Sequence, residues 1–106
     1  PEQYSYRYLG QVFVKGKKTP VAVFEVYEGE SELLKALKTQ TRGEFERGVE
    51  LYELEKFEQA QAVFESILEK NEQDKPARLY VERSQNAQNS RKDGSWEEAE
   101  THQENR

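Results

Sequence analysis

The stretch Gly48–Leu68, GVELYELEKFEQAQAVFESIL, determines how the rest of the chain is arranged. Its apolar residues recur at helical spacing on both sides of a charged break at Glu55 and Lys56, which predicts two amphipathic helices. A connection of about two residues makes such helices antiparallel neighbours. We predict that mostly aromatic and small residues pack them together. These residues are Phe45, Gly48, Tyr52, Phe57, Ala60, Phe64, Ile67 and, from a third helix, Tyr80.

The composition limits both the size of the core and the classes of partner. The chain has 106 residues, of which 34% are hydrophobic and 35% charged, and it starts at Pro1. We therefore expect one small domain, or a piece of a larger protein. The net charge of −5 argues against nucleic-acid binding. The absence of cysteine excludes disulfides and thiolate metal sites and suits a reducing compartment.

Two segments before the helices have strand character. Tyr4–Val14 and Val21–Tyr27 are rich in aromatic and β-branched residues, and Gly16 and Pro20 lie in the polar segment between them. They predict a β-hairpin. Its second strand is apolar on both faces, which is typical of a strand covered on both sides. Because an isolated hairpin is only marginally stable, it needs the helices or a missing sheet to pack against.

Further helices are expected on either side of the helical hairpin. A short helix within Glu28–Lys38, capped by Ser31, is predicted to precede it. Thr41 and Glu44 form a T-x-x-E capping box that marks the start of the next helix. Asp74 is the expected N-cap of a third, capping helix that runs to about residue 86. The predicted fold class is α+β, mostly α.

The last residues of the chain have a different composition. Residues 89–106 are rich in Asn, Gln, Ser and charges, and we predict a disordered tail there. The alternative is that Trp96 docks on a partner or on a parent domain. The lone histidine, His102, cannot make a metal site without convergent partners. The expected domains are thus a β-hairpin at 1–28, a helical module at 29–88 and the tail at 89–106.

The helical hairpin resembles a single tetratricopeptide repeat (TPR). The positions that match the family pattern are Gly48, Phe57, Ala60, Phe64 and Ile67. The positions that depart from it are Glu44, Arg47 and Glu72, where the family has Trp, Leu and Pro. The alternative is an unrelated two-helix hairpin with an aromatic core.

The segment at 8–29, YLGQVFVKGKKTPVAVFEVYEG, resembles the last two strands of the catalytic domain of bacterial class III adenylate and guanylate cyclases. In that family, LG-x-V-x-VKGK followed by PV-x-x-x-EV closes the domain. The matching residues are Leu9, Gly10, Val12, Val14, Lys15, Gly16, Lys17, Pro20, Val21, Glu25 and Val26. Some bacterial cyclases carry a helical, TPR-like extension directly after this hairpin, in the same order as here.

The cyclase resemblance implies one binding residue and no catalytic ones. Lys15 stands where the family's lysine contacts the nucleotide phosphates, which an ammonium group does as a point charge. The alternative is a solvated turn lysine beside Lys17 and Lys18. The family's metal-binding aspartates lie upstream of the hairpin and have no counterpart here. We therefore expect this chain to be no enzyme and to hold no cofactor, whereas a parent cyclase, a phosphorus–oxygen lyase, would use two Mg or Mn ions.

Two functions remain open from the sequence. One is a C-terminal accessory or regulatory segment of a cyclase in intracellular cyclic nucleotide signalling. Its partners would be the rest of the cyclase, a second copy, or another protein bound by the helices. The other is a stand-alone TPR-like protein-binding module. No run approaches the ~20 apolar residues of a membrane span, so we expect no membrane contact and a cytoplasmic location, although a parent could be anchored upstream.

Overall fold

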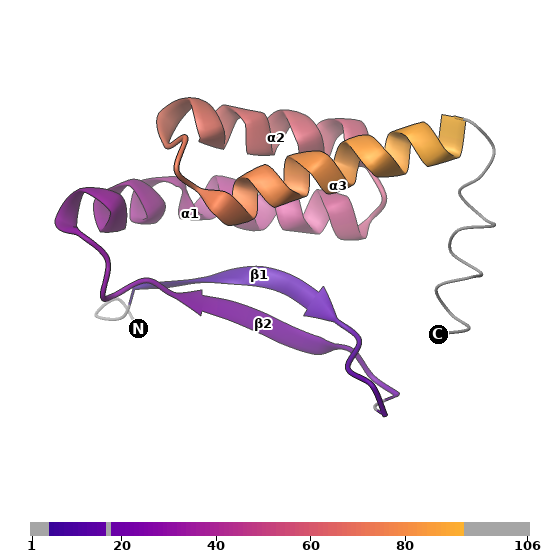
Figure 1. Cartoon of the computed structure of the whole chain (residues 1–106), viewed down its shortest axis with the longest axis horizontal. Coiled ribbons are helices and arrows are strands. Elements are labelled where there is room, and N and C mark those ends of the chain that lie inside the picture. Colours follow the sequence, from indigo (N-terminus) through magenta and orange to yellow (C-terminus); the bar gives the residue numbers. More distant parts are fainter. Residues whose placement is uncertain (1–4, 17, 93–106) are drawn as a thin grey trace.

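The computed structural model describes residues 5–16 and 18–92, which form a two-stranded sheet followed by three helices (Figure 1). The strands are β1 (Tyr6–Val12) and β2 (Val21–Val26), and the helices are α1 (Glu32–Glu53), α2 (Phe57–Lys70) and α3 (Lys75–Lys92). The predicted fold class, α+β and mostly α, is confirmed.

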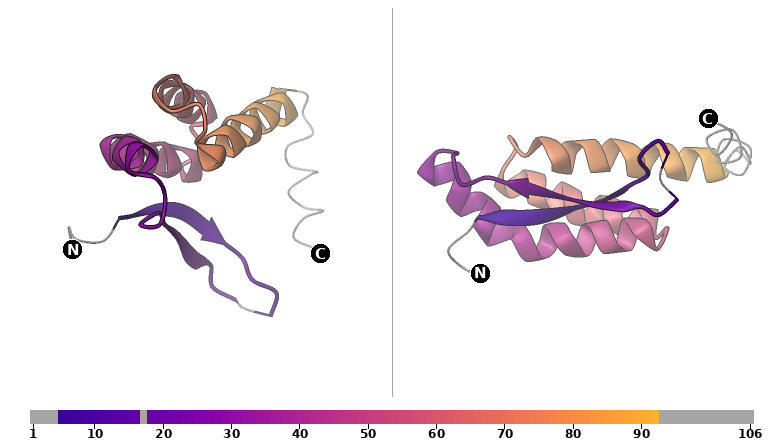
Figure 2. Two further views of the ribbon diagram at one scale, coloured as in Figure 1. Left: turned by 60° about the vertical axis from the view of Figure 1, so that its left-hand side comes forward. Right: turned by 90° about the horizontal axis from the view of Figure 1, so that it is seen from below.

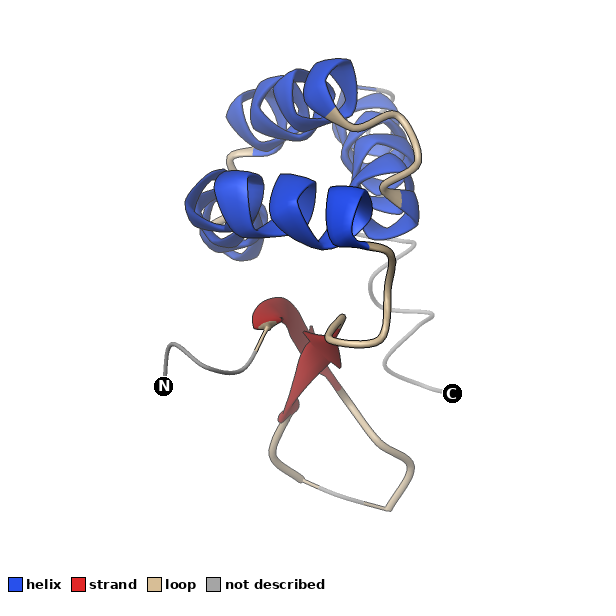
Figure 3. Ribbon diagram, turned by 90° about the vertical axis from the view of Figure 1, so that its left-hand side faces the viewer, coloured by secondary structure: helices blue, strands red, loops and turns tan. Residues whose placement is uncertain are grey.

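The elements are arranged in layers. The strands form an antiparallel hairpin on one side of the helices, next to α1 and α3 (Figure 2). Helix α2 lies on the far side of α1 and α3 and packs against both of them. Figure 3 shows the hairpin as a separate layer beside the three helices. The hairpin therefore meets the helices mainly through β1.

Helix α1 differs from the prediction of two separate helices. It begins after Ser31, whose hydroxyl accepts a hydrogen bond from the Leu34 amide at 3.2 Å, and it continues without a break to Glu53. The predicted capping box at Thr41 is wrong. Thr41 is buried inside the helix, and its hydroxyl donates to the Leu37 carbonyl one turn earlier at 2.9 Å. Glu44 instead accepts a hydrogen bond from Lys70 of α2 at 2.6 Å.

The connection from α1 to α2 is short because α1 ends in a Schellman motif. The Glu55 amide donates to the Tyr52 carbonyl, and the Lys56 amide donates to the Leu51 carbonyl, both at 2.9 Å. Glu55 adopts the left-handed conformation that this motif requires, with a φ of 63°. The chain reverses within this turn, so α2 starts at Phe57 and runs back along α1.

Aromatic side chains form the centre of the helical core. The rings of Phe64 and Tyr80 stack with centroids 4.7 Å apart, and Phe45 meets the Phe64 ring edge-on at 5.2 Å. Gly48 makes this packing possible, because a Cβ atom there would lie 2.7 Å from the Phe64 ring. The close approach of α1 and α2 thus depends on a glycine facing an aromatic ring.

Helix α3 starts where the sequence predicts and ends later. The Asp74 carboxylate accepts a hydrogen bond from the Ala77 amide at 3.2 Å, so the N-cap prediction is confirmed. The helix runs to Lys92 rather than to residue 86, and the expected boundary at 88/89 falls inside it. Ala87 is buried and Gln88 donates to Gln61 of α2 at 2.6 Å. These contacts with the rest of the helical core stabilise the last turns of α3, although their sequence is mostly polar. The rest of the predicted tail, with Trp96 and His102, lies outside the described residues.

Candidate functional site

A fully buried arginine joins the hairpin to the helices. Arg7 of β1 donates to both carboxylate oxygens of Asp74 at 2.7 Å each, and its Nε donates to Glu25 of β2 at 2.7 Å. The guanidinium also lies over the ring of Phe45, 4.0 Å from its centroid. Burial acts to lower the pKa of Arg7, but Asp74 and Glu25 outweigh it and the pKa is raised. Arginine suits this position because its planar group can stack and pair in two directions at once.

Asp74 connects two structural roles. Both carboxylate oxygens accept hydrogen bonds from Arg7, and one of them also accepts the Ala77 amide that caps α3. The Asp74 side chain is fully buried. A negative charge is favourable at a helix N-terminus, where free backbone amides carry partial positive charge. Capping and ion pairing therefore reinforce each other, and they fix the start of α3 against β1.

A second buried cation extends this network. Lys38 of α1 is hydrogen-bonded to Glu25 and to Glu30, each at 2.8 Å. Burial acts to lower the pKa of Lys38, but the hydrogen bonds to the two carboxylates outweigh it and the pKa is raised. Glu25 thus bridges Arg7 and Lys38, so that both strands, α1 and α3 meet in one ionic cluster. We call Arg7, Glu25, Glu30, Lys38 and Asp74 the ionic latch.

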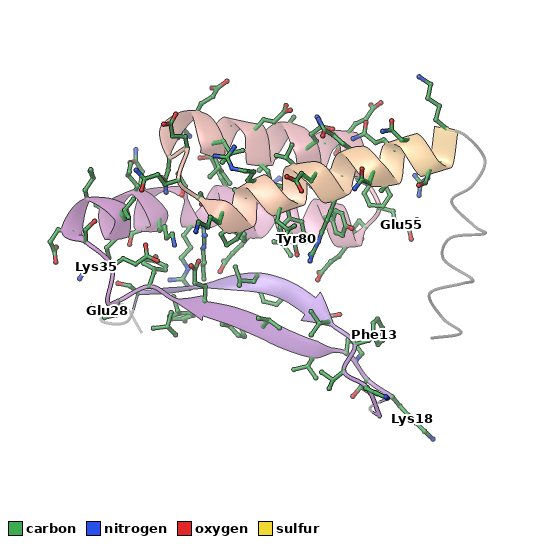
Figure 4. All side chains as sticks on the ribbon, viewed as in Figure 1. Phe13, Lys18, Glu28, Lys35, Glu55 and Tyr80 are labelled. Carbon is green, nitrogen blue, oxygen red and sulfur yellow. The ribbon has the colours of Figure 1, made fainter. Side chains whose placement is uncertain are left out.

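The middle of β1 is held through its backbone. The Tyr8 amide donates to Glu46 of α1 at 2.9 Å, and the Leu9 carbonyl accepts from the Tyr80 hydroxyl of α3 at 2.6 Å. Figure 4 shows Tyr80 on the side of α3 that faces the hairpin. At the next residue, Gly10, a Cβ atom would collide with the Tyr80 hydroxyl, and the φ of 117° also favours glycine.

Tyr80 makes the attachment of β1 depend on pH. Burial raises the pKa of Tyr80 to about 12, whereas an unfolded tyrosine ionises at about pH 10. The stability that neutral Tyr80 contributes is complete below about pH 10 and is lost as the pH rises toward 12, a loss of about 2 to 3 kcal/mol. Phenylalanine cannot ionise, so Tyr80→Phe does not show this loss. The variant should be less stable than the native chain at pH 8, where it lacks the hydrogen bond to Leu9, and the difference in stability should shrink as the pH rises. Urea unfolding at pH 8 and pH 11 measures the gap, and a constant gap would contradict the prediction.

The side of the hairpin turned away from the latch is apolar, and on it the Phe24 ring lies 5.4 Å from the Tyr8 ring and 6.1 Å from the Tyr6 ring between centroids. Glu25 points to the latch and Tyr27 is buried, with its hydroxyl bonded to Thr39. Their neighbours Phe24 and Val26 point the other way and are 53% and 72% exposed. We call Phe24 and Val26 the outer face. Phe13, near the end of the hairpin, is 78% exposed (Figure 4).

The structure separates the residues that the sequence singles out. Lys15 is exposed at the tip of the hairpin. The predicted packing residues lie in the helical core: Phe45, Gly48, Phe57, Ala60, Phe64, Ile67 and Tyr80 are buried, and Tyr52 is half-buried. Within the described residues, no cluster of His, Cys, Asp or Glu could hold a metal ion. Over the same residues, no helix is long and apolar enough to span a membrane.

Sequence reasoning missed the ionic latch. Arg7 lies in a strand among tyrosines, and Glu25 interrupts an apolar run in the partner strand. A charged residue in each of two paired apolar strands was a signal for a buried pair. The third partner, Asp74, is 67 residues from Arg7, and no local pattern connects them.

Comparison with known proteins gives one informative similarity. The chain is 32% identical over 82 residues to a Dictyostelium discoideum protein described as "Adenylate cyclase, terminal-differentiation specific". The match covers 77% of this chain and 4% of that protein. This chain is similar to part of an adenylate cyclase. No family model matches the chain, and no solved structure matches it.

The length of this match shows which elements share the similarity with the cyclase. A stretch of 82 residues within a chain of 106 cannot avoid residues 25–82. That range contains α1, α2 and the start of α3. The similarity therefore extends well beyond the segment of the hairpin on which the cyclase resemblance first rested. The bacterial origin, the cyclase class and the TPR character remain predictions.

Proposed function

We propose that this chain is a C-terminal accessory segment of a class III adenylate or guanylate cyclase that acts in intracellular cyclic nucleotide signalling. The observation that carries the proposal is the similarity to an adenylate cyclase, which runs through the helices. In such a protein the hairpin closes the catalytic domain, and the TPR-like helical module regulates, dimerises or docks it. The cyclase and this segment lie in the cytoplasm, whether or not the protein is anchored in a membrane upstream.

The outer face supports this placement of the hairpin. Phe24 and Val26 are exposed on a two-stranded sheet, which is marginally stable without further packing. Exposed apolar patches mark sites where another surface docks. The rest of the cyclase is the proposed partner, and a second copy of this chain is the other candidate.

The chemistry belongs to the parent protein. It would convert a nucleoside triphosphate to a cyclic nucleotide with two divalent metal ions, Mg or Mn, held by residues outside this chain. Lys15 is the residue of this chain that would contact the nucleotide phosphates. Its exposed position at the tip leaves its ammonium group accessible to such a ligand.

Lys15 and Lys18 provide a matched test, because both are exposed near the tip. In the intact cyclase, Lys15→Ala should raise the KM for the nucleoside triphosphate about tenfold, since a charged hydrogen bond contributes about 1.5 kcal/mol or more. Lys18→Ala should change the KM less than twofold. Equal effects of the two substitutions would contradict the phosphate contact. If the intact polypeptide formed no cyclic nucleotide, the proposed function itself would be wrong.

A further inference from the structure

Strand β1 is held by the helices in the way that a bound peptide is held by a receptor. Arg7 pairs with Asp74 at the start of α3. The Tyr8 amide and the Leu9 carbonyl bond to side chains of α1 and α3. Three successive residues of an extended segment are thus recognised through charge and main-chain groups by two different helices.

Two positions of β1 select the residue type. At Arg7 the helical side offers the Asp74 carboxylate and the Phe45 ring, which a planar guanidinium can pair with and stack on but a lysine cannot. The other carboxylate at Arg7, Glu25, comes from β2 of the hairpin itself. At Gly10 the Tyr80 hydroxyl leaves no room for a Cβ atom, and the positive φ of 117° also favours glycine. The contacts therefore specify an Arg-x-x-Gly pattern in a strand with a bulge between Tyr8 and Gly10. Tyr8 and Leu9 are bound through their backbones and also through their side chains, which pack on the helical core, and the Tyr8 hydroxyl donates to Glu53.

We propose that the face formed by α1 and α3 is a binding site for an extended Arg-x-x-Gly segment, and that β1 of the same chain is its occupant. The helical module then binds the hairpin of its own chain. A peptide from another molecule can bind the same face only when the hairpin has dissociated from the helices. This inference does not rest on a cyclase function, because every contact that carries it lies within this chain.

A peptide competition experiment tests the proposal on the full chain. Arg7→Glu places a carboxylate beside Asp74 and Glu25, so we expect it to release the hairpin while Asp74, Glu46 and Tyr80 remain in place. A fluorescent peptide of residues 5–14 should then bind the variant at least tenfold more tightly than the native chain, as measured by anisotropy. Peptides carrying Arg7→Ala or Gly10→Ala should bind at least tenfold more weakly, and one carrying Gln11→Ala should bind equally. Equal binding to native and variant chains, or loss of this order among the peptides, would overturn the proposal.

A second measurement applies if circular dichroism shows that Arg7→Glu unfolds the helices. The substitution Gly10→Ala is made in two backgrounds, the native chain and the Tyr80→Phe variant. It should lower the folding equilibrium constant at least tenfold more in the native chain, because the phenylalanine of the variant lacks the colliding hydroxyl. Gly16 is the control, since its φ is also positive and, among the described residues, no atom lies within 4 Å of the place where its Cβ atom would stand. Gly16→Ala should cost the same in both backgrounds. Additive effects of Gly10→Ala and Tyr80→Phe would overturn the proposal.

Discussion

Replacing Asp74 with alanine is expected to destabilise the protein by about 3 to 5 kcal/mol, the cost of breaking a buried ion pair by removing one partner. Arg7 would remain fully buried with Glu25 as its sole described carboxylate partner, and Glu25 already serves Lys38. The start of α3 would also lose its cap. Because small domains are stable by only about 5 to 15 kcal/mol, this single change removes a large share of the stability.

Asp74→Asn separates the two roles of this side chain. Asparagine is a good N-cap but carries no charge, so this variant should recover about 1 kcal/mol relative to Asp74→Ala and still lack the ion pair. Glu69→Ala, at an exposed position of α2, is the control and should stay within about 0.5 kcal/mol of the native chain. Chemical denaturation followed by circular dichroism measures all three variants. A cost below about 1 kcal/mol for Asp74→Ala would show that the latch does not hold the hairpin to the helices.

Local patterns in the sequence predict most of the elements of this fold. Apolar residues at helical spacing around Glu55 and Lys56 predict α1 and α2 because both helices bury one continuous stripe. The N-cap at Asp74 is equally local, since it depends on one side chain and an amide three residues later. The strands follow from their β-branched and aromatic composition.

The errors arise where tertiary contacts override local signals. Thr41 and Glu44 have the spacing of a capping box, but Thr41 is buried within α1 and Glu44 reaches Lys70 on the neighbouring helix. Packing on β1 and α2 therefore keeps the helix continuous through residues that could also start one. The late end of α3 has the same origin, because a buried Ala87 supports a helix that its polar neighbours do not predict.

The candidate site could be predicted only in part. Lys15 is found from a sequence pattern, and its exposed position is compatible with that interpretation. The face of the hairpin that meets the helices depends on pairing between Arg7 and Asp74, which are 67 residues apart. Charges in an apolar strand indicate that a partner is needed, but the sequence does not say which carboxylate supplies it.

Charged residues on the outer face should have a small effect on the isolated chain and a large effect on an intact cyclase. We expect Phe24→Glu combined with Val26→Glu to lower the stability of this chain by only about 1 to 2 kcal/mol, because both positions are exposed and the main loss is the packing of the Phe24 ring on Tyr6 and Tyr8. In the intact cyclase, the same two residues are proposed to pack against the catalytic domain. Burying two unpaired carboxylates there would cost several kcal/mol, so cyclic nucleotide formation should fall at least about a hundredfold.

A matched control distinguishes docking from a general effect of surface charge. Leu33 is an apolar side chain that is 69% exposed, like those of the outer face, but it lies on α1 and not on the hairpin. Leu33→Glu should leave the activity of the intact cyclase unchanged within about twofold, and it should leave the isolated chain equally stable. If the double substitution on the outer face were as harmless to the intact cyclase as Leu33→Glu, the hairpin could not be packed against the catalytic domain through Phe24 and Val26. The open face would then be available to a second copy of the chain, which sedimentation of the isolated chain with and without the two substitutions would reveal.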